Sequence, residues 1–315
     1  MSLAFVFPGQ GSQSVGMLAG LAAAHPIVQR TFDEASAALG FDLWQLVVNG
    51  PVERLNSTEC TQPAMLAAGV ATYRLWREQG GADPAVVAGH SLGEFTALVC
   101  AGALEFPAAA ALVHARGQLM QQAVPAGGGA MAAILGLDDA DAEAACAEAA
   151  QGEVVEAVNY NAPGQIVIAG QTAAVERAIA AAKARGAKRA VTLPVSVPAH
   201  SSLMRGAAHQ LQARLATLTL RAPVIPYISA VDAELHREPE DLRGLLVRQL
   251  ASPVRWSATV LALTARGATL LAECGPGKVL TALNKRIERR PEIQCCAIED
   301  DASLQTALVA AGSLN

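Results

Sequence analysis

A serine flanked by glycines, between an apolar run and a helix-like run, constrains the fold of this chain more than any other feature. Residues 85–88 (AVVA) are apolar and partly β-branched, GHSLG follows at 89–93, and a helical pattern runs from Glu94 to Gly102. A strand, a tight glycine turn and a helix in this order form the unit of a parallel sheet with crossover helices. The chain is therefore expected to fold as an α/β protein.

The composition is that of a globular protein. The chain has 315 residues, of which 52% are hydrophobic and 16% charged, and this apolar content is enough to offset the entropy of ordering. A chain of this length holds about two domains, or one large α/β domain with an insertion. The net charge of −5 provides no general attraction to a phosphate backbone, so nucleic acid is not expected as a partner.

The sequence carries no signal for export, membrane insertion or metal binding. The first apolar run meets Pro8 and Gly9 without a preceding basic segment, and later apolar stretches are interrupted well before about 18 residues. We therefore expect a cytoplasmic protein with no membrane contact. The six cysteines show no CxxC spacing and no Cys/His group at metal-ligand intervals, so buried or incidental thiols are expected, with no metal site.

The pattern changes in the middle of the chain. From 130 to 193 it predicts, in order, a strand, an acidic Ala-rich helix, two strands around the tetrapeptide NAPG, a second helix and a last strand. This βαββαβ order is that of a ferredoxin-like unit. We predict a ferredoxin-like small domain at residues 127–196, inserted into a large α/β domain formed by residues 1–126 and 197–315.

The GHSLG stretch has the form of a nucleophile elbow. Gly89 and Gly93 leave room for a sharp strand-to-helix turn that projects the hydroxyl of Ser91, while backbone N–H groups and the helix N-terminus face the substrate. Such donors stabilise the oxyanion of a tetrahedral intermediate. The context favours a nucleophile, and the alternative is a structural glycine turn with an idle serine.

A serine nucleophile needs a base, normally histidine, and the chain has six histidines. His90 adjoins the serine, but neighbours at an elbow point in different directions. His200 lies at a loop-to-helix junction where the chain leaves the predicted insertion, a position typical of clefts. The remaining histidines lie within helical runs or in polar and loop surroundings. His200 is the leading candidate, although position alone does not decide the assignment.

Arg116 is a cation in a mostly apolar helical stretch. Burying a guanidinium costs several kcal/mol unless it is paired. Arg116 must therefore meet either a carboxylate of this chain or a carboxylate of a ligand. The internal pair is the default interpretation, and the fork of arginine also suits a substrate carboxylate.

Two glycine-containing loops lack the residues of a nucleotide site. The loop FPGQGSQ at 7–13 lacks the Gly-Lys-Ser/Thr of a phosphate loop and the third glycine of a dinucleotide loop, and GPGKV at 275–279 has valine where a phosphate loop needs serine or threonine. Neither loop predicts nucleotide binding.

Seven stretches taken together resemble the malonyl-CoA:acyl carrier protein transacylase family along nearly the whole chain. They are FPGQGSQ at 7–13, GHSLGE at 89–94, RGQLMQ at 116–121, YNAPGQIVIAG at 160–170, VPAHSSLM at 197–204, QLASPVRW at 249–256 and ECGPGKVL at 273–280. One such string is weak evidence, but seven in this order and spacing are highly specific. The family implies a hydrolase-like α/β core, a ferredoxin-like small domain and an active site in the gorge between them.

The resemblance also implies roles for individual residues. Ser91 matches the nucleophile and His200 the general base and acid, which the family orients by a main-chain carbonyl, here that of Gln249. The backbone N–H groups of Gln10 and Leu92 match the oxyanion hole, and Gln10 also matches a substrate-binding position. Arg116 matches the guanidinium that clamps the malonyl carboxylate. Asn161 matches a substrate-binding residue, and Gln165 matches the border of the gorge. Malonyl transfer would run through a serine ester from malonyl-CoA to acyl carrier protein, for fatty acid elongation, with no bound cofactor.

The acyl carrier protein that the family implies is acidic and needs a positive docking surface. Two basic clusters are candidates, each also typical of a solvated face. The small-domain cluster is Lys183, Arg185, Lys188 and Arg189, and the C-terminal cluster is Lys285, Arg286, Arg289 and Arg290. The chain is expected to be a monomer.

Other functions stay open at this point. A serine hydrolase or thioesterase would use Ser91 and His200 equally well, but no acidic third member of a triad is identifiable. A catalytically silent binding protein would have no need for the full set of site candidates. A malonyl loader for a polyketide synthase or a malonate decarboxylase would keep the chemistry and change the pathway. The sequence departs from the family at Phe95, where tyrosine is common, and at Ala199, whose small side chain leaves open how strictly malonyl is preferred over methylmalonyl.

Overall fold

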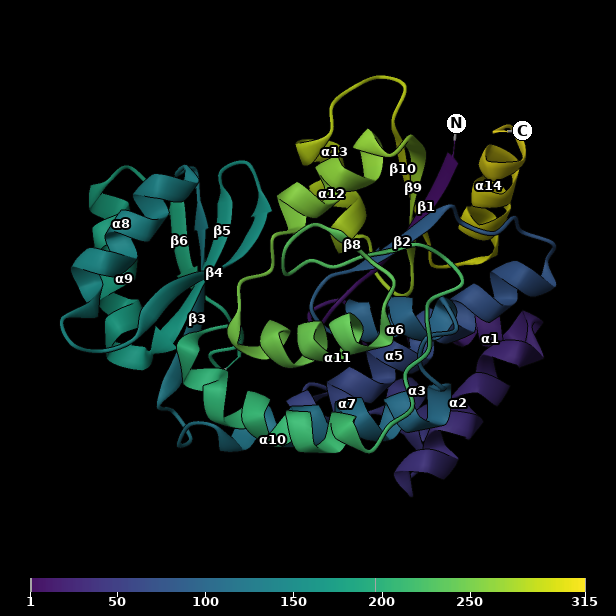
Figure 1. The fold of residues 1–315 in the computed structure, drawn as a ribbon, viewed down its shortest axis with the longest axis horizontal. Coiled ribbons are helices and arrows are strands. Elements are labelled where there is room, and N and C mark those ends of the chain that lie inside the picture. The colour runs from purple at the N-terminus through teal and green to yellow at the C-terminus, as the bar shows by residue number, and fades with distance from the viewer. Residues whose placement is uncertain (1, 196, 315) are drawn as a thin grey trace.

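The computed structural model describes residues 2–195 and 197–314, and within them the chain forms two separate sheets (Figure 1). One sheet is six-stranded and mainly parallel, and the other is four-stranded and antiparallel. This arrangement confirms the predicted fold class, an α/β core with a ferredoxin-like unit. The predicted domain limits at residues 1, 196 and 315 lie outside the described residues.

The strands of the large sheet come from both ends of the chain. They are β1 Ser2–Phe7, β2 Val86–Gly89, β7 Tyr227–Ile228, β8 Leu235–His236, β9 Ala268–Cys274 and β10 Gln294–Ile298. Their order across the sheet is β10-β9-β1-β2-β7-β8, and all neighbours are parallel except β7 and β8. Because β1 and β2 are parallel neighbours, the loops that follow them meet at the carboxyl edge of the sheet, where ligands bind in open α/β folds.

The helices of the large unit connect these strands and cover both faces of the sheet. In chain order they are α1 Ala19–Ala24, α2 Pro26–Leu39, α3 Leu43–Asn49, α4 Val52–Leu55, α5 Thr58–Glu78, α6 Gly93–Cys100, α7 Phe106–Gln122, α10 Arg205–Ala216, α11 Pro239–Arg248, α12 Trp256–Ala265, α13 Val279–Ile287 and α14 Asp301–Gly312. Within the described parts of the chain, none of the helices is both long and apolar enough to cross a membrane.

Alternate side chains of β1 enter two different apolar cores. Leu3, Phe5 and Phe7 pack in the core that includes α2, α5, α6 and α7. Ala4 and Val6 pack on the opposite face, in the core that includes α12 and α13. Since successive side chains of a strand point to opposite faces, both faces of the large sheet are buried.

The small sheet has the predicted order of elements. These are β3 Gly129–Leu135, α8 Asp139–Ala150, β4 Val155–Ala162, β5 Gln165–Gln171, α9 Thr172–Ala184 and β6 Arg189–Thr192. The strand order is β4-β5-β3-β6 with antiparallel pairs throughout, which is the ferredoxin-like topology. One face of the sheet packs Ile134, Ile166 and Ile168 in a core shared with α8 and α9, and the predicted βαββαβ order is confirmed.

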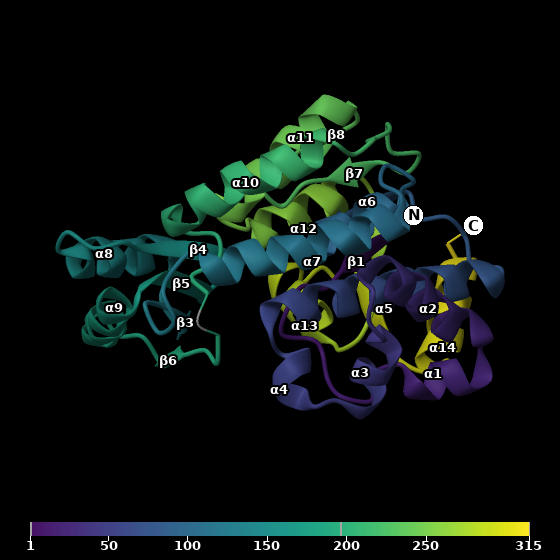
Figure 2. The same ribbon diagram turned by 90° about the horizontal axis from the view of Figure 1, so that it is seen from below.

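The small sheet is joined to the large unit beside His200. The backbone of β4 exchanges hydrogen bonds of 2.8 and 2.9 Å with Val254. The carboxylate of Glu156 on β4 accepts from the backbone N–H and the hydroxyl of Ser202, each at 2.7 Å. The long helix α7 runs along the large unit and ends next to the small one (Figure 2). These contacts place one face of the small sheet against the carboxyl edge of the large sheet.

Candidate active site

Ser91 lies in a sharp turn between β2 and α6, as the glycine spacing predicts. Its φ is 51°, in the left-handed region that strains a residue with a side chain. A Cβ on Gly89 would lie 1.9 Å from the carbonyl carbon of Gly93, and a Cβ on Gly93 would lie 2.0 Å from the carbonyl oxygen of Phe7. Only glycine fits at these two positions, so they permit the turn that directs Ser91 into a cavity.

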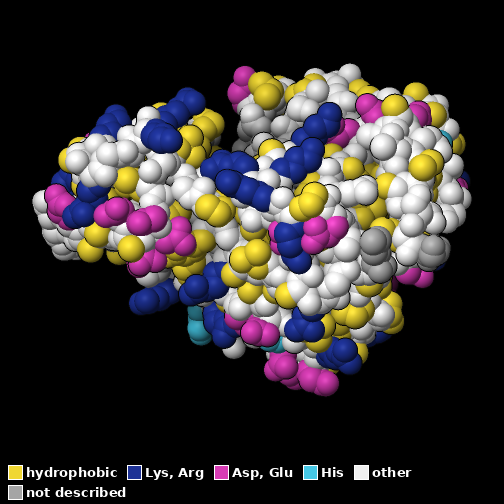
Figure 3. Space-filling view, turned by 90° about the horizontal axis from the view of Figure 1, so that it is seen from above, with side chains coloured by type: hydrophobic (Ala, Val, Ile, Leu, Met, Phe, Trp, Pro, Cys, Tyr) yellow, Lys and Arg dark blue, Asp and Glu magenta, His cyan; other side chains and the backbone are white. Residues whose placement is uncertain are grey.

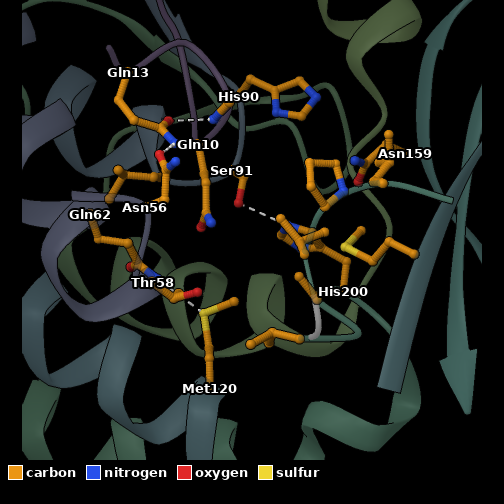
Figure 4. Close-up of a pocket in the computed structure, with 18 of the residues that line it drawn as sticks. Gln10, Gln13, Asn56, Thr58, Gln62, His90, Ser91, Met120, Asn159 and His200 are labelled. Atoms are coloured by element: carbon orange, nitrogen blue, oxygen red, sulfur yellow. Dashed lines mark hydrogen bonds between the residues drawn. The ribbon is translucent and has the colours of Figure 1, made fainter. Parts of the chain in front are cut away.

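The structure brings His200 to Ser91. Nε2 of His200 lies 2.7 Å from Oγ of Ser91 (Figure 4), and Nδ1 lies 2.9 Å from the main-chain carbonyl oxygen of Gln249. Because a carbonyl oxygen only accepts, Nδ1 carries the ring hydrogen and Nε2 is free to accept the serine proton. The backbone N–H of His200 donates to the carbonyl of Leu250 at 3.1 Å, which fixes the residue in its own left-handed conformation at φ 67°.

Burial and a nearby cation keep the imidazole of His200 neutral. Burial is the larger cause and the Arg116 guanidinium the second, and together they lower the pKa of His200 from 6.5 to about 3. The hydrogen bond from Nδ1 to the carbonyl of Gln249 opposes the shift only in part. A neutral imidazole is the form that accepts a proton, so His200 is ready to act as a base at neutral pH.

Arg116 lies on α7 with its guanidinium buried beside the serine. Nη2 lies 3.4 Å from Oγ of Ser91. Nη1 donates to Oε1 of Gln62 at 2.8 Å, and Nη2 donates to Oε1 of Gln249 at 2.9 Å. The ring of Phe95 lies 5.5 Å from the guanidinium carbon. The neutral oxygens and the ring face hold the cation in place without neutralising it.

The default expectation that Arg116 forms an internal ion pair is wrong. Over residues 2–195 and 197–314, its hydrogen-bond partners are amide and hydroxyl oxygens rather than carboxylates, and its buried Nε has no partner. Burial lowers the pKa of Arg116 to about 10, partly opposed by the more distant carboxylate of Glu94, so the side chain stays charged at neutral pH. A buried cation with no adjacent anion can pair with a ligand carboxylate.

Two residues that line the cavity beside Ser91 have backbone N–H groups without an acceptor in the described segments. Leu92 is the N-cap of α6, and its N–H is among those that a helix leaves unpaired. Gln10 lies in the loop after β1, and its N–H makes no hydrogen bond with any described residue. Such a pair of free donors next to a nucleophile is what a developing oxyanion requires.

The site opens into a cavity of about 530 Å³. One wall comes from the large unit and carries polar side chains, namely Gln10, Gln13, Asn56, Thr58 and Gln62 (Figure 4). The other wall comes from the small unit and is mainly apolar, with Met131, Leu193, Pro194 and Val195. Asn159 of β4 is the polar exception on this side, and its buried Oδ1 has no partner in the described chain. A cavity of this size accommodates an extended small-molecule group.

The structure does not support the predicted contact of Asn161 with substrate. Asn161 is buried near the end of β4, where its Oδ1 lies 2.8 Å from Nε2 of His90, and of the described residues it is Asn159 that lines the cavity from this strand. Gln165 also lies outside the cavity wall, because its Oε1 accepts from Arg286 of α13. Asn161 therefore orients the His90 ring, and Gln165 holds the small unit to α13.

Comparison with known proteins identifies the family of this site. The family described as "Acyl transferase domain" matches residues 4–300. The malonyl CoA-acyl carrier protein transacylase of Escherichia coli (strain K12) is 56% identical over 305 residues, which cover 97% of this chain and 98% of that relative. The chain belongs to the acyl transferase family. The resemblance to the malonyl-CoA:acyl carrier protein transacylases, which seven sequence stretches carry, is confirmed.

Solved structures of malonyl transacylases share the acyl transferase fold seen in this chain. An acyl carrier protein S-malonyltransferase from Vibrio cholerae has a TM-score of 0.94 at 56% identity, and the match covers 97% of this chain and 99% of that one. A malonyl-transacylase in complex with a type II PKS acyl-carrier protein has a TM-score of 0.97 at 53% identity, covering 98% and 100%.

Sequence reasoning missed three residues of this acyl transferase site. Gln62 on α5 is separated from its partner Arg116 by 54 positions, and no local pattern connects the two. Asn159 lies two positions before Asn161, the residue that the family resemblance implied. Glu94 carried a usable signal in the sequence, because it is an acid at the start of an apolar helical run. In the structure it is 1% exposed.

Proposed function

We propose that this chain transfers malonyl groups from malonyl-CoA to the phosphopantetheine thiol of acyl carrier protein, by way of a malonyl ester on Ser91, and so supplies fatty acid synthesis. Relatives that match this chain over nearly their full length bear the name malonyl CoA-acyl carrier protein transacylase. The observation that carries the proposal is the buried Arg116 guanidinium, which has no carboxylate partner among described residues and lies 3.4 Å from Ser91.

The first half-reaction loads the serine. Nε2 of His200 takes the proton from Oγ of Ser91 as Oγ attacks the thioester carbonyl of malonyl-CoA. The carbonyl oxygen becomes an oxyanion, which the N–H groups of Gln10 and Leu92 stabilise. When the intermediate collapses, the carbon–sulfur bond breaks, the CoA sulfur receives the proton from His200, and Ser91 holds the malonyl group as an ester.

The second half-reaction unloads the serine onto the carrier. The phosphopantetheine thiol replaces CoA in the cavity and gives its proton to His200, and the thiolate attacks the ester carbonyl. The same two N–H groups stabilise the second oxyanion. Collapse breaks the bond to Oγ, which regains its proton from His200, so serine and histidine return to their starting states. Every step uses side chains and backbone groups of this chain, and the scheme needs no cofactor.

Arg116 accounts for the choice of acyl group. The malonyl carboxylate would pair with the guanidinium through charge-assisted hydrogen bonds, using donors that the neutral amides of Gln62 and Gln249 leave free. An acetyl group has no carboxylate and would leave the buried cation without a counter-charge. We therefore propose that Arg116 selects half-acids, while Ala199 on the cavity wall leaves space near the acyl group.

The C-terminal basic cluster is the better candidate for docking the carrier. Lys285 and Arg286 lie in the last turn of α13, and Arg286 also donates to the carbonyl oxygen of Pro163 in the small unit at 3.1 Å. The cluster therefore lies where the two units meet, and Figure 3 shows Lys and Arg side chains gathered between them. A carrier bound here would lie beside both walls of the cleft.

Two arginines of the proposed clusters already have anionic partners. Arg185 pairs with Glu148 at 3.0 Å, and Arg290 pairs with Glu288 at 2.7 Å. Surface pairs of this kind reduce the net positive charge that a partner meets. The docking proposal therefore depends mainly on the other members, which are Lys183, Lys188, Arg189, Lys285, Arg286 and Arg289.

Hydrolysis is the competing reaction, and CoA release distinguishes it from transfer. The protein is mixed with malonyl-CoA in the presence or absence of a holo acyl carrier protein, and free CoA is followed over time. Transfer predicts a burst of about one CoA per active site without the carrier and sustained release with it. Sustained release without any carrier would contradict the proposal. A type II polyketide carrier is a useful second acceptor, because a malonyl-transacylase solved with such a carrier is 53% identical to this chain.

A further inference from the structure

A buried carboxylate lies behind the nucleophile and takes no part in the reaction scheme. Glu94 stands in the first turn of α6 and is 1% exposed. Its Oε1 accepts three hydrogen bonds, from Oη of Tyr227 at 2.5 Å, Oγ of Ser229 at 2.8 Å and the backbone N–H of Ala230 at 2.7 Å. Its Oε2 accepts from Nε2 of Gln249. All four neighbours donate, which favours the ionised form of a group whose pKa burial raises.

Gln249 connects this carboxylate to His200, to the backbone of Ser91 and to Arg116. Its main-chain carbonyl holds Nδ1 of His200 at 2.9 Å. Its side-chain Nε2 donates to Glu94 and, at 2.9 Å, to the backbone carbonyl of Ser91. Its side-chain Oε1 accepts from Nη2 of Arg116 at 2.9 Å. The side-chain amide thus lies between a buried anion and a buried cation.

The chemistry of its neighbours permits only one orientation of the Gln249 amide. Arg116 can only donate, so it requires the oxygen. The carboxylate of Glu94 and the carbonyl of Ser91 can only accept, so they require the NH₂ group. A reversed amide would place donor against donor at Arg116 and acceptor against acceptor at Glu94.

We propose that Glu94 is a positioning residue for acyl selection: it fixes the direction of the Gln249 amide, and the amide in turn holds the Arg116 guanidinium where it receives the carboxylate of the acyl group. The proposal rests on the proposed function, because it concerns how malonyl is recognised. It extends that function by assigning a role to a residue that contacts neither the substrate nor Ser91 Oγ.

We call the chain of hydrogen bonds from Glu94 through the Gln249 amide to Arg116 the relay. The isosteric variant Glu94→Gln tests the relay, because it replaces one acceptor oxygen with an NH₂ group and keeps the shape of the side chain. The backbone N–H of Ala230 can only donate, so Oε1 of the new glutamine faces it and the NH₂ group faces Gln249. The NH₂ group of Gln249 then meets a donor in place of an acceptor, while the carbonyl of Ser91 and the guanidinium of Arg116 still require the present direction of the amide. The amide is displaced from residue 94, its oxygen no longer holds the Arg116 guanidinium, and the cation moves from its position beside Ser91.

A direct effect of charge would act in the opposite direction, and this makes the test decisive. Removing the negative charge of Glu94 raises the positive potential around Arg116, which by itself favours malonyl over acetyl. The relay predicts instead that malonyl is lost preferentially. The sign of the change in selectivity therefore distinguishes the two.

The measurement is kcat/KM for acylation of Ser91 by malonyl-CoA and by acetyl-CoA, taken as a ratio. Glu94→Gln is expected to lower the malonyl-to-acetyl ratio by about tenfold or more, the value of a hydrogen bond to a charged group. Ser229→Ala is the matched control, because it removes one donor to Oε1 and leaves Oε2 with Gln249; its ratio should stay within about twofold of the wild-type value. A ratio in Glu94→Gln that is unchanged or raised would overturn the proposal.

A second pair of variants keeps the test valid if Glu94→Gln is poorly stable. Gln249→Met removes the amide and keeps the main-chain carbonyl that holds His200, so it should lower the ratio as Glu94→Gln does. In the Gln249→Met background, Glu94→Gln should change the ratio by less than about twofold, because the relay is already broken. Additive effects would contradict the relay. Failure of the wild-type protein to form a malonyl ester would instead contradict the proposed function, so the two failures are distinguishable.

Discussion

Lowering the pH tests whether His200 is held as a neutral base. A histidine with an ordinary pKa of about 6.5 is about 97% protonated at pH 5, which would reduce a base-dependent rate roughly 30-fold. Burial and the Arg116 cation lower the pKa of His200 to about 3, so the imidazole stays neutral at pH 5. We expect the single-turnover rate constant for Ser91 acylation, followed by rapid quench and intact mass, to fall by less than about twofold between pH 7.5 and 5.

The same pKa shift predicts a pH-dependent stability with a definite sign. The pKa of His200 is lower in the folded than in the unfolded chain, so the unfolded chain binds the proton first, and stability is lost as the pH falls from 6.5 toward 3. At pH 5.5 this loss is about 1.4 kcal/mol. It is measured by urea unfolding at pH 7.5 and 5.5 as the difference between wild type and His200→Gln. An acylation midpoint near pH 6.5, or the same pH dependence of unfolding in both proteins, would refute the reasoning.

Three further predictions follow from contacts at the site and the surface. Arg116→Ala should lower kcat/KM for malonyl-CoA by about 100-fold, because the charge-assisted hydrogen bonds to the malonyl carboxylate are lost, and should leave kcat/KM for acetyl-CoA no lower than in the wild type. Equal losses for the two substrates in steady-state assays would contradict this prediction. Gly93→Ala should lower the free energy of unfolding by at least about 2 kcal/mol, because the added Cβ would lie 2.0 Å from a carbonyl oxygen. The control Gly20→Ala on α1 places its Cβ more than 4 Å from any other group and should cost almost nothing. Similar urea midpoints for the two variants would contradict this prediction. Lys285→Glu or Lys188→Glu should raise the KM for acyl carrier protein about tenfold and leave the KM for malonyl-CoA unchanged, and equal changes in both constants would exclude docking there.

The features that sequence alone predicted are those set by near neighbours in the chain. The Gly89 and Gly93 spacing requires a turn that only glycine permits, and the structure shows both close approaches. The alternation of strands and helices in residues 130–193 predicted the small sheet and its two helices, because hydrophobic periodicity reports local conformation directly. The family resemblance then extended these local inferences to the whole chain.

The features that sequence did not predict depend on residues brought together from far apart. The partners of Arg116 come from α5 and from the segment after α11, so no local pattern identified them as neutral amides rather than a carboxylate. Asn159 and Asn161 lie two positions apart on β4, where a regular strand would point both to the same face. The register with β5 shifts between Ala157 and Asn159 and again between Tyr160 and Ala162, and of the two residues Asn159 lines the cavity. Glu94 was visible as an acid in an apolar helix, but its link to Arg116 requires the side chain of Gln249.

Intact mass spectrometry after brief mixing with malonyl-CoA tests the central claim most directly, because transfer through an ester on Ser91 requires a covalent intermediate. The account predicts that the protein gains the mass of one malonyl group, that addition of holo acyl carrier protein removes it, and that Ser91→Ala gains none. A malonyl adduct that persists in Ser91→Ala would contradict the account.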